Sequence, residues 1–469
     1  MVINKNIRPT EILQTMAGFS TFCSSPEQSG LKTLLRSLLV FTFALTLLPA
    51  VLLSQTIDLS EYSTQIRLNE AESIIDELRE VFGVIETRSG AYSPDLIEPS
   101  ILLGDAERKL GELTTALEHY DRALHLTRTN FGLFSPEQAD IVYRQSSTYL
   151  EMRSFILAQE KEEYAYEVLS RAYGSNSPDL LPAIQRMGEF YLKTFNFLGA
   201  RALYKKGLRS GQDAFRDKPQ NSIPFLKGIA DSYKLERFPP YYVEDYSQNA
   251  GQSGIRDLDL TAELYTINNF PAGERALQEI IAIRRQQFPQ TVDPEFTAET
   301  LNGTELQGAL ELNQATLDLA DWHLLFGRVR DARTLYTYIF EQNAKLADKG
   351  NLDFSSPSLL YVPTIKPLIK TREKAGREPS QGIVKVTFEV NANGRVRNME
   401  TVESSPKGLM DFRVRRTLRD AIYRPKIENS GAVNTTGQTF EHKFEHYELA
   451  KKTPESAEKE SQDSSETAG

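Results

Sequence analysis

The chain of 469 residues contains a single cysteine, Cys23, and five histidines. One cysteine excludes an intramolecular disulfide, so no covalent cross-link stabilises the fold. A lipid-modified amino terminus would need a cysteine directly after an apolar segment, whereas Cys23 comes before the apolar run at residues 38–53. The sequence therefore predicts neither a disulfide nor a lipoprotein.

Basic residues are fewer than acidic ones. There are 54 lysines and arginines against 64 aspartates and glutamates, which gives a formal net charge of −10. A chain with this balance has no general attraction to nucleic acid or to anionic lipid. Hydrophobic residues make up 40% and charged residues 25%, the composition of an ordinary globular protein with two or three domains.

The short motifs that mark common active sites are also missing: the sequence has no G-x-x-x-x-G-K-[ST], H-E-x-x-H, G-x-S-x-G or G-x-G-x-x-G. His442 and His446 occupy alternate places in a strand-like segment, which puts them about 13 Å apart. Zinc–nitrogen bonds are about 2 Å long, so this pair cannot share an ion. We expect no catalytic, cofactor-binding or metal-binding residues, and a protein that is not an enzyme.

One apolar segment stands out, an uncharged run at residues 38–53 preceded by Lys32 and Arg36 and followed by acidic residues. Positive charge before the run and negative charge after it place the rest of the chain outside the cytoplasm. As a helix the run would span about 24 Å, less than a hydrocarbon core of about 30 Å. Residues 1–55 are therefore predicted to be an amino-terminal extension with a cleaved signal peptide. An uncleaved inner-membrane anchor is the alternative.

A heptapeptide returns at a fixed interval in the next part of the chain. It reads GAYSPDL at 90–96, GLFSPEQ at 132–138 and GSNSPDL at 174–180. Glycine tolerates the left-handed conformation that closes a helix, serine caps the next helix, and proline fits its first position. Helices should end at Gly90, Gly132 and Gly174 and restart at Ser93, Ser135 and Ser177. The constant period of 42 residues predicts a repeated helical unit.

Small and large residues alternate within these units. Ala116, Ala158 and Ala200 fall in register, and Tyr120 and Tyr204 follow the first and third four residues later. This pattern resembles the tetratricopeptide repeat (TPR), in a version of about 42 residues. The resemblance is extended by Gly104 and Gly111, by Ala320, Gly327, Ala332 and Tyr336 in a later unit, by a weaker second helix at 272–288, and by a leading half-repeat at 65–88.

The TPR resemblance implies an all-α solenoid over residues 56–350, whose stacked helix pairs bind another protein or an extended peptide on their concave surface. The aromatic stripe of Tyr120, Tyr149, Tyr191 and Tyr204 is expected to be core between helices. Near 236–260 an irregular insertion interrupts the pattern. Its tyrosines, Tyr241, Tyr242 and Tyr246, either pack back on the solenoid, which we favour, or contact a partner.

After Asp353 the pattern changes from helical to alternating. Val384, Val386, Phe388 and Val390 alternate with polar residues, Asn391–Gly394 is a turn, and a return strand follows at 395–402. Residues 408–422 have helical spacing, the sequence YRPKIENSG ends that helix, and 437–448 alternate again. The expected order is ββαβ, a small α+β domain.

This carboxyl-terminal segment resembles the TonB carboxyl-terminal domain. The resemblance is carried by GIVKVTFEVNANGRVRNMETVESSP, the helix, YRPKI around Pro425, and the closing strand, and it covers residues 360–448. It implies a periplasmic domain that binds a partner strand at the open edge of its sheet, by backbone pairing. On the closing strand the edge side chains are Thr439, Glu441, Lys443 and Glu445.

Together these features predict a periplasmic protein-binding adaptor or scaffold of the bacterial envelope, linked to outer-membrane transport, with proteins or extended peptides as partners. Outer-membrane TonB-dependent receptors are candidates, nucleic acid is not, and residues 38–53 could contact the inner membrane. The alternative is an anchored TonB-type energy transducer. The adaptor is favoured because no histidine precedes His119 and because a solenoid replaces the family's proline-rich spacer. Residues 449–469, rich in Lys, Glu and Ser, are expected to be a disordered tail.

Overall fold

The computed structural model describes residues 59–239, 254–255, 258, 260, 263, 270–288, 299, 301–346, 349–366, 380–429 and 431–446. Up to residue 346 its regular structure is helical, and from residue 358 onward it is mostly strand. The predicted combination of an all-α solenoid and a small α+β domain is therefore confirmed.

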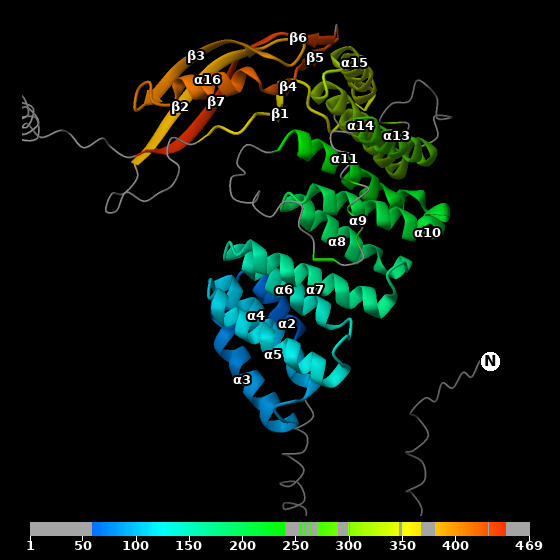
Figure 1. Ribbon diagram of the computed structural model, residues 1–469, viewed down its shortest axis with the longest axis vertical. Helices are drawn as coiled ribbons and strands as arrows, with labels where there is room; N and C mark the ends of the chain where they lie inside the picture. Colours follow the sequence, from blue (N-terminus) through cyan, green and yellow to red (C-terminus); the bar gives the residue numbers. More distant parts are fainter. Residues whose placement is uncertain are drawn as a thin grey trace, which may run out of the picture. The chain divides into compact units, whose positions relative to one another are not determined.

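Six helix pairs make up the solenoid in the described part of the chain, and Figure 1 shows them following one another in sequence order. The pairs are α2 (Ser60–Arg67) with α3 (Ala71–Ser89), α4 (Ile97–Leu110) with α5 (Leu113–Phe131), α6 (Gln138–Glu151) with α7 (Phe155–Tyr173), α8 (Leu181–Lys193) with α9 (Phe197–Ser210), α11 (Ile223–Arg237) with α13 (Phe270–Gln287), and α14 (Gly303–Leu325) with α15 (Val329–Lys345). The leading unit is a complete pair with a short first helix, and not the half-repeat that was predicted. Short helices η1 (Pro94–Leu96), η2 (Pro178–Leu180), α10 (Gln212–Asp217) and η3 (Pro219–Ser222) connect some of the pairs.

The heptapeptides lie between pairs, as predicted, but their glycines differ from the expected conformation. Gly90, Gly132 and Gly174 have φ of 88°, 99° and 94° with ψ of 159°, 161° and 140°. The positive φ is that of a left-handed cap, whereas the extended ψ lies in a region that is essentially restricted to glycine. The chain therefore leaves each of these helices in an extended direction, and these positions need glycine even more strictly than a left-handed cap would.

The serines of the motif do not all act alike. Ser93 and Ser177 accept hydrogen bonds from the N–H of Asp95 and Asp179, at 3.2 and 3.1 Å, so each caps the turn that follows. Ser135 instead donates its hydroxyl to the carboxylate of Glu137, which lowers the pKa of that carboxyl. Two of the three predicted serine caps are thus confirmed.

Close approach of the helices explains the alternation of small and large residues. Ala116, Ala158 and Ala200 are fully buried. A Cβ atom built on Gly104 would lie 2.5 Å from the ring of Tyr120, and one on Gly188 would lie 2.7 Å from the ring of Tyr204. The tyrosine rings therefore occupy space that only a glycine on the facing helix leaves open. Of the predicted aromatic core, Tyr120, Tyr191 and Tyr204 are buried and Tyr149 is partly buried.

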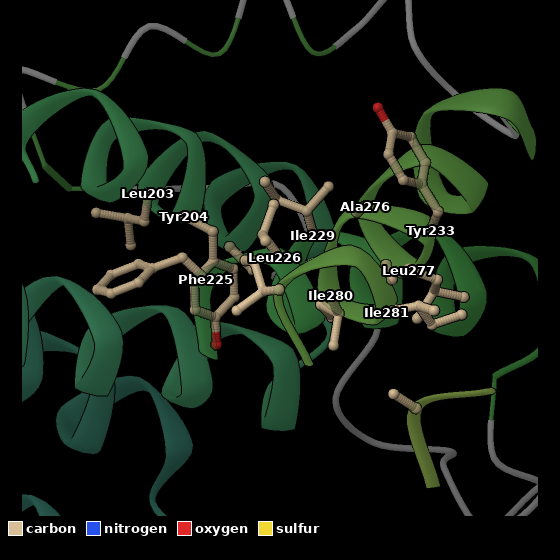
Figure 2. Close-up of a cluster of buried hydrophobic side chains, with 14 of the residues drawn as sticks. Leu203, Tyr204, Phe225, Leu226, Ile229, Tyr233, Ala276, Leu277, Ile280 and Ile281 are labelled. Carbon is tan, nitrogen blue, oxygen red and sulfur yellow. The ribbon is translucent and has the colours of Figure 1, made fainter. Parts of the chain in front are cut away.

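The fifth pair is split by the predicted insertion, which separates α11 from α13. The two helices nevertheless pack directly, because Leu226, Ile229 and Tyr233 of α11 meet Leu277, Ile280 and Ile281 of α13 in one buried cluster (Figure 2). Tyr241, Tyr242 and Tyr246 lie outside the described residues, so both interpretations of these tyrosines remain predictions.

The carboxyl-terminal domain contains β1 (Ser358–Tyr361), β2 (Ser380–Val390), β3 (Val396–Ser405), α16 (Asp411–Arg419), β4 (Ile422–Arg424), β5 (Lys426–Glu428), β6 (Gly431–Val433) and β7 (Thr435–His446). β2, β3, α16 and β7 confirm the predicted ββαβ order. Their antiparallel sheet has the order β3-β2-β7, and Val384, Val386 and Phe388 pack with Val414 and Leu418 of α16.

The short strands β1, β4, β5 and β6 were not predicted. YRPKIENSG lies outside the helix, as predicted, and it also contains β5 and parts of β4 and β6. β4 pairs with β1, which precedes it by more than 60 residues, and β5 pairs with β6. Strands of three or four residues are too short to show an alternating pattern, so the sequence carries no period from which to identify them. These strands pack on α14 and α15 in a cluster that includes Ala320, Ile339, Ile422 and Ile427.

Candidate protein-binding surfaces

β7 is an edge strand. It pairs with β2 from Ser380–His446 to Val390–Thr435, and no described strand pairs with its other side. Gly437 has a φ of 74°, close to the point where the register with β2 shifts between Phe388 and Val390. The backbone groups on the open side of a regular strand can pair with an incoming chain, which makes this edge a candidate site for strand addition.

The four side chains predicted for the edge, Thr439, Glu441, Lys443 and Glu445, all lie exposed on one face of β7. The only ion pair recorded for them is between Lys443 Nζ and Glu441 Oε1, at 3.4 Å. Exposure leaves these four residues available to a partner. Whether a partner uses them stays a prediction.

The opposite face of β7 is held in the domain. Phe444 is buried, with the rings of His442 and His446 on either side at centroid distances of 6.1 and 6.0 Å. Burial lowers the pKa of His442. This face therefore fixes the strand and leaves its edge and outer face for binding.

A groove on the solenoid was not identified from the sequence. It has a volume of about 570 Å³ and is lined by α2, α4, α6 and α8. Ile101 and Tyr143 give it apolar walls, and the guanidinium of Arg186 stacks on Tyr143, with Cζ 3.6 Å from the ring centre. Arg67, Arg108 and Lys109 stand where the groove meets the turns between helices. The lining also includes the acids Glu98, Asp105 and Asp140. An extended segment with acidic side chains would therefore meet opposite charge at the basic margin of the groove.

An arginine–carboxylate–tyrosine cluster links consecutive helix pairs. Asp105 of α4 accepts a hydrogen bond from the hydroxyl of Tyr120 at 2.7 Å and receives Arg144 Nε of the next pair at 3.0 Å. Burial, together with the neighbouring charge of Asp105, raises the pKa of Tyr120, so the hydroxyl stays protonated and donates. The equivalent arginine 42 residues later, Arg186, holds Glu162 by two hydrogen bonds.

A second cluster of the same three residue types joins the last helix pair to the carboxyl-terminal domain. Asp321 of α14 accepts from the hydroxyl of Tyr336 at 2.7 Å, just as Asp105 accepts from Tyr120. Its arginine is Arg424 of β4, with Nε–Oδ1 at 3.0 Å and Nη2–Oδ2 at 2.6 Å. Arg424 therefore makes the contact to Asp321 that an arginine of a following helix pair would make, as Arg144 does to Asp105. In this respect β4 replaces the first helix of a following pair. In the sequence, Arg424 stood out only as part of YRPKI. Its pairing with Asp321 could not be inferred, because the two residues are 103 positions apart.

Among the described residues no group of three or more His, Cys, Asp or Glu is placed to hold a metal ion. Within the same residues no helix has the length and apolar character needed to cross a membrane, and the run at 38–53 lies outside them.

One family model matches the carboxyl-terminal part of the chain. Residues 373–445 match the family described as Gram-negative bacterial TonB protein C-terminal. The solved structures that are similar include BtubC (BKLC) from P. vanneervenii, at 14% identity and a TM-score of 0.38, covering 68% of this chain and 99% of that one. A putative kinesin light chain from Podosopora anserina with nearly identical TPR-like repeats has 13% identity and a TM-score of 0.36, covering 54% and 97%. No curated protein sequence matches the chain.

Proposed function

We propose that the chain is a non-enzymatic adaptor of the Gram-negative cell envelope that binds an extended segment of a partner by strand addition to β7. The observation that carries the proposal is the edge of β7, with which no described strand pairs, within a segment that matches the TonB C-terminal family. Backbone pairing gives affinity at such an edge, and the alternating side chains Glu441, Lys443 and Glu445 select the sequence of the segment. The match to this family supports a location in the periplasm and contact with outer-membrane transport proteins.

Backbone pairing can be tested with peptides. A fluorescent peptide from the periplasmic amino-terminal segment of an outer-membrane TonB-dependent receptor is titrated with the full chain. Two matched derivatives carry N-methyl groups on alternate amides, one set on odd positions and one on even positions. Added strands donate only every second N–H to their neighbour, so one derivative should lose binding and the other should keep it. Equal binding by both derivatives would show that recognition does not use strand pairing.

A second partner segment is proposed for the solenoid groove, on the basis of its apolar walls and basic margins. Replacing Ser147, which lines the groove, by tryptophan should fill it, whereas Glu118→Trp on the exposed face of α5 serves as a control of equal bulk. Proteins captured by the full chain from envelope extracts should then separate into two sets. Ser147→Trp should remove one set, and Glu441→Lys with Lys443→Glu should remove the other. Loss of the same proteins in both variants would argue for a single binding surface.

Direct energy transduction is the competing function. It requires the chain to remain attached to the inner membrane, whereas the adaptor function does not. Mass spectrometry of the mature amino terminus after cell fractionation distinguishes the two. A start near residues 51–56 in the soluble periplasm supports the adaptor, and an intact residue 38–53 segment in the membrane fraction supports the transducer.

A further inference from the structure

The first four helix pairs share one turn geometry where their two helices join. The turns centre on Asn69, Gly111, Arg153 and Phe195, which follow one another at intervals of 42 residues. All four have positive φ, of 64°, 86°, 57° and 62°. The turns therefore occupy equivalent places in successive pairs. We call residues 67–70, 108–112, 151–154 and 193–196 the turn edge.

Contacts between neighbouring turns join the first three turns of the edge. Lys109 Nζ donates to Asn69 Oδ1 at 3.1 Å, which joins the first turn to the second. Arg108 Nε lies 3.7 Å from Glu151 Oε1, which joins the second to the third. Side chains from separate repeats are thus presented side by side.

Apolar side chains recur along this edge and face solvent. Leu68, Leu110 and Met152 each precede the positive-φ residue of their turn, and they are 66%, 40% and 40% exposed. Ile156 and Leu157, at the start of α7, are exposed next to the third turn. Core packing does not account for apolar residues that the repeat places outward at the same position three times.

The charge of the turn edge is opposite to that of the chain. The turn edge contains five bases, Arg67, Arg108, Lys109, Arg153 and Lys193, and three acids, Glu70, Glu112 and Glu151. The loops between pairs, residues 89–95, 131–137 and 173–179, contain three acids and no base. Those loops also expose large apolar side chains, including Tyr92 and Phe134. Both the turns within helix pairs and the loops between pairs therefore expose apolar side chains, but only the turns within pairs carry net positive charge.

We propose that the turn edge lies on the surface of a phospholipid bilayer with anionic headgroups. Leu68, Leu110 and Met152 enter the headgroup–acyl boundary, and the lysines and arginines beside them meet the phosphates. These side chains project from exposed helix ends, which suits a flat surface better than a peptide that needs a groove to enclose it. The net charge of −10 repels such a surface as a whole, so the attraction is local and decreases as salt screens it.

A fluorescent probe on the edge tests the proposal. The full chain with Cys23→Ser carries an environment-sensitive dye on a cysteine introduced at Leu110, and is mixed with vesicles of phosphatidylethanolamine and phosphatidylglycerol or of phosphatidylcholine alone. With phosphatidylglycerol we expect the emission to shift to shorter wavelength and to be quenched by brominated lipid, and high salt to reverse both changes. Phosphatidylcholine alone should leave the dye in water even if the apolar run binds those vesicles.

Two variants keep the result specific. The same dye at Leu133, in the acidic loop set, should remain in water with both lipids. Lys109→Glu with Arg153→Glu, checked for native helix content by circular dichroism, should remove the response at residue 110. An unresponsive dye at residue 110, or equal responses at 110 and 133, would refute the proposal. A response to vesicles that is lost in Ser147→Trp, the variant that fills the groove, would likewise refute it and assign the bases to the groove.

Discussion

Arg424 of β4 holds Asp321 of α14 through two hydrogen bonds, and both side chains are less than one-fifth exposed. Burial by itself lowers the pKa of Arg424, but the hydrogen bonds and charge of Asp321 outweigh it, and the net pKa is raised. Asp321 in turn fixes the hydroxyl of Tyr336. The junction between the solenoid and the carboxyl-terminal domain is thus a charged cluster set in an apolar surround.

Removing the guanidinium should weaken this junction. Arg424→Met leaves the Asp321 carboxylate without its cation in a mostly buried place, and we expect a loss of about 2 kcal/mol in the free energy of unfolding. The only tryptophan, Trp322, follows Asp321 directly and is buried, so its fluorescence during urea unfolding reports on this site. The more exposed pair of Lys426 with Glu428, with side chains 33% and 51% exposed, provides the control, because Lys426→Met should change stability by less than about 0.5 kcal/mol. Equal effects from both variants would contradict the importance of the buried pair.

Gly188→Ala should destabilise the solenoid by about 1–3 kcal/mol, since the added methyl group would meet the buried ring of Tyr204. Gly83, inside α3, has no atom within 4 Å of its Cβ position. Gly83→Ala should therefore stabilise the protein by about 0.5–1 kcal/mol, because alanine favours the helix. Thermal unfolding of the two variants gives the comparison, and a stabilised Gly188→Ala variant would show that the ring can move aside.

Arg153 occupies a left-handed backbone conformation for which glycine is better suited. Arg153→Gly should increase the free energy of unfolding by about 1 kcal/mol, and Gly111→Ala, at the equivalent turn, should decrease it by a similar amount. Both can be measured by urea unfolding. The two substitutions should change the free energy of unfolding in opposite directions. A decrease in both variants would show that the left-handed backbone conformation of Arg153 is not strained.

Acid should destabilise the domain that contains β7. Burial lowers the pKa of His442 from its ordinary value of 6.5, so below that pH the unfolded chain binds a proton more readily than the folded one. The free energy of unfolding should then decrease as pH falls from about 7.5 to about 5.5. His442→Gln cannot titrate and should show a smaller decrease in urea midpoint. His119 and His323, whose pKa values burial also lowers, should keep part of the effect in that variant. If the free energy of unfolding of His442→Gln decreased with falling pH as much as that of the unsubstituted chain, His442 would not contribute to the pH dependence.

The sequence predicts those parts of the fold that rest on short-range chemistry. The 42-residue interval, the buried alanines at 116, 158 and 200, and the strand alternation at 384–390 are all local patterns, and the structure confirms them. The need for a small residue at Gly104 agrees with its place in the predicted repeat, whereas the same need at Gly188 was not predicted. The exposure of alternate side chains on β7 follows from the strand, which puts alternate residues on opposite faces.

What could not be predicted depends on pairing across long distances. β1 and β4 are brought together by the fold and by nothing in their own three or four residues. The role of Arg424 becomes visible only when Asp321 and Tyr336 are compared with Asp105 and Tyr120, since the partner comes from a strand in one case and from a helix in the other. The groove likewise combines residues from four helices, and no single segment of the sequence contains it.

Helical stacks of this kind end in a face that resembles the face between their own units, and such an end can bind another copy. Here β4 and its arginine cover that end, because Asp321 and Tyr336 are already satisfied within the same chain. A second copy would have to displace Arg424 before one of its own arginines could reach Asp321. The small β domain therefore caps the last helix pair, as terminal units cap other helical repeats.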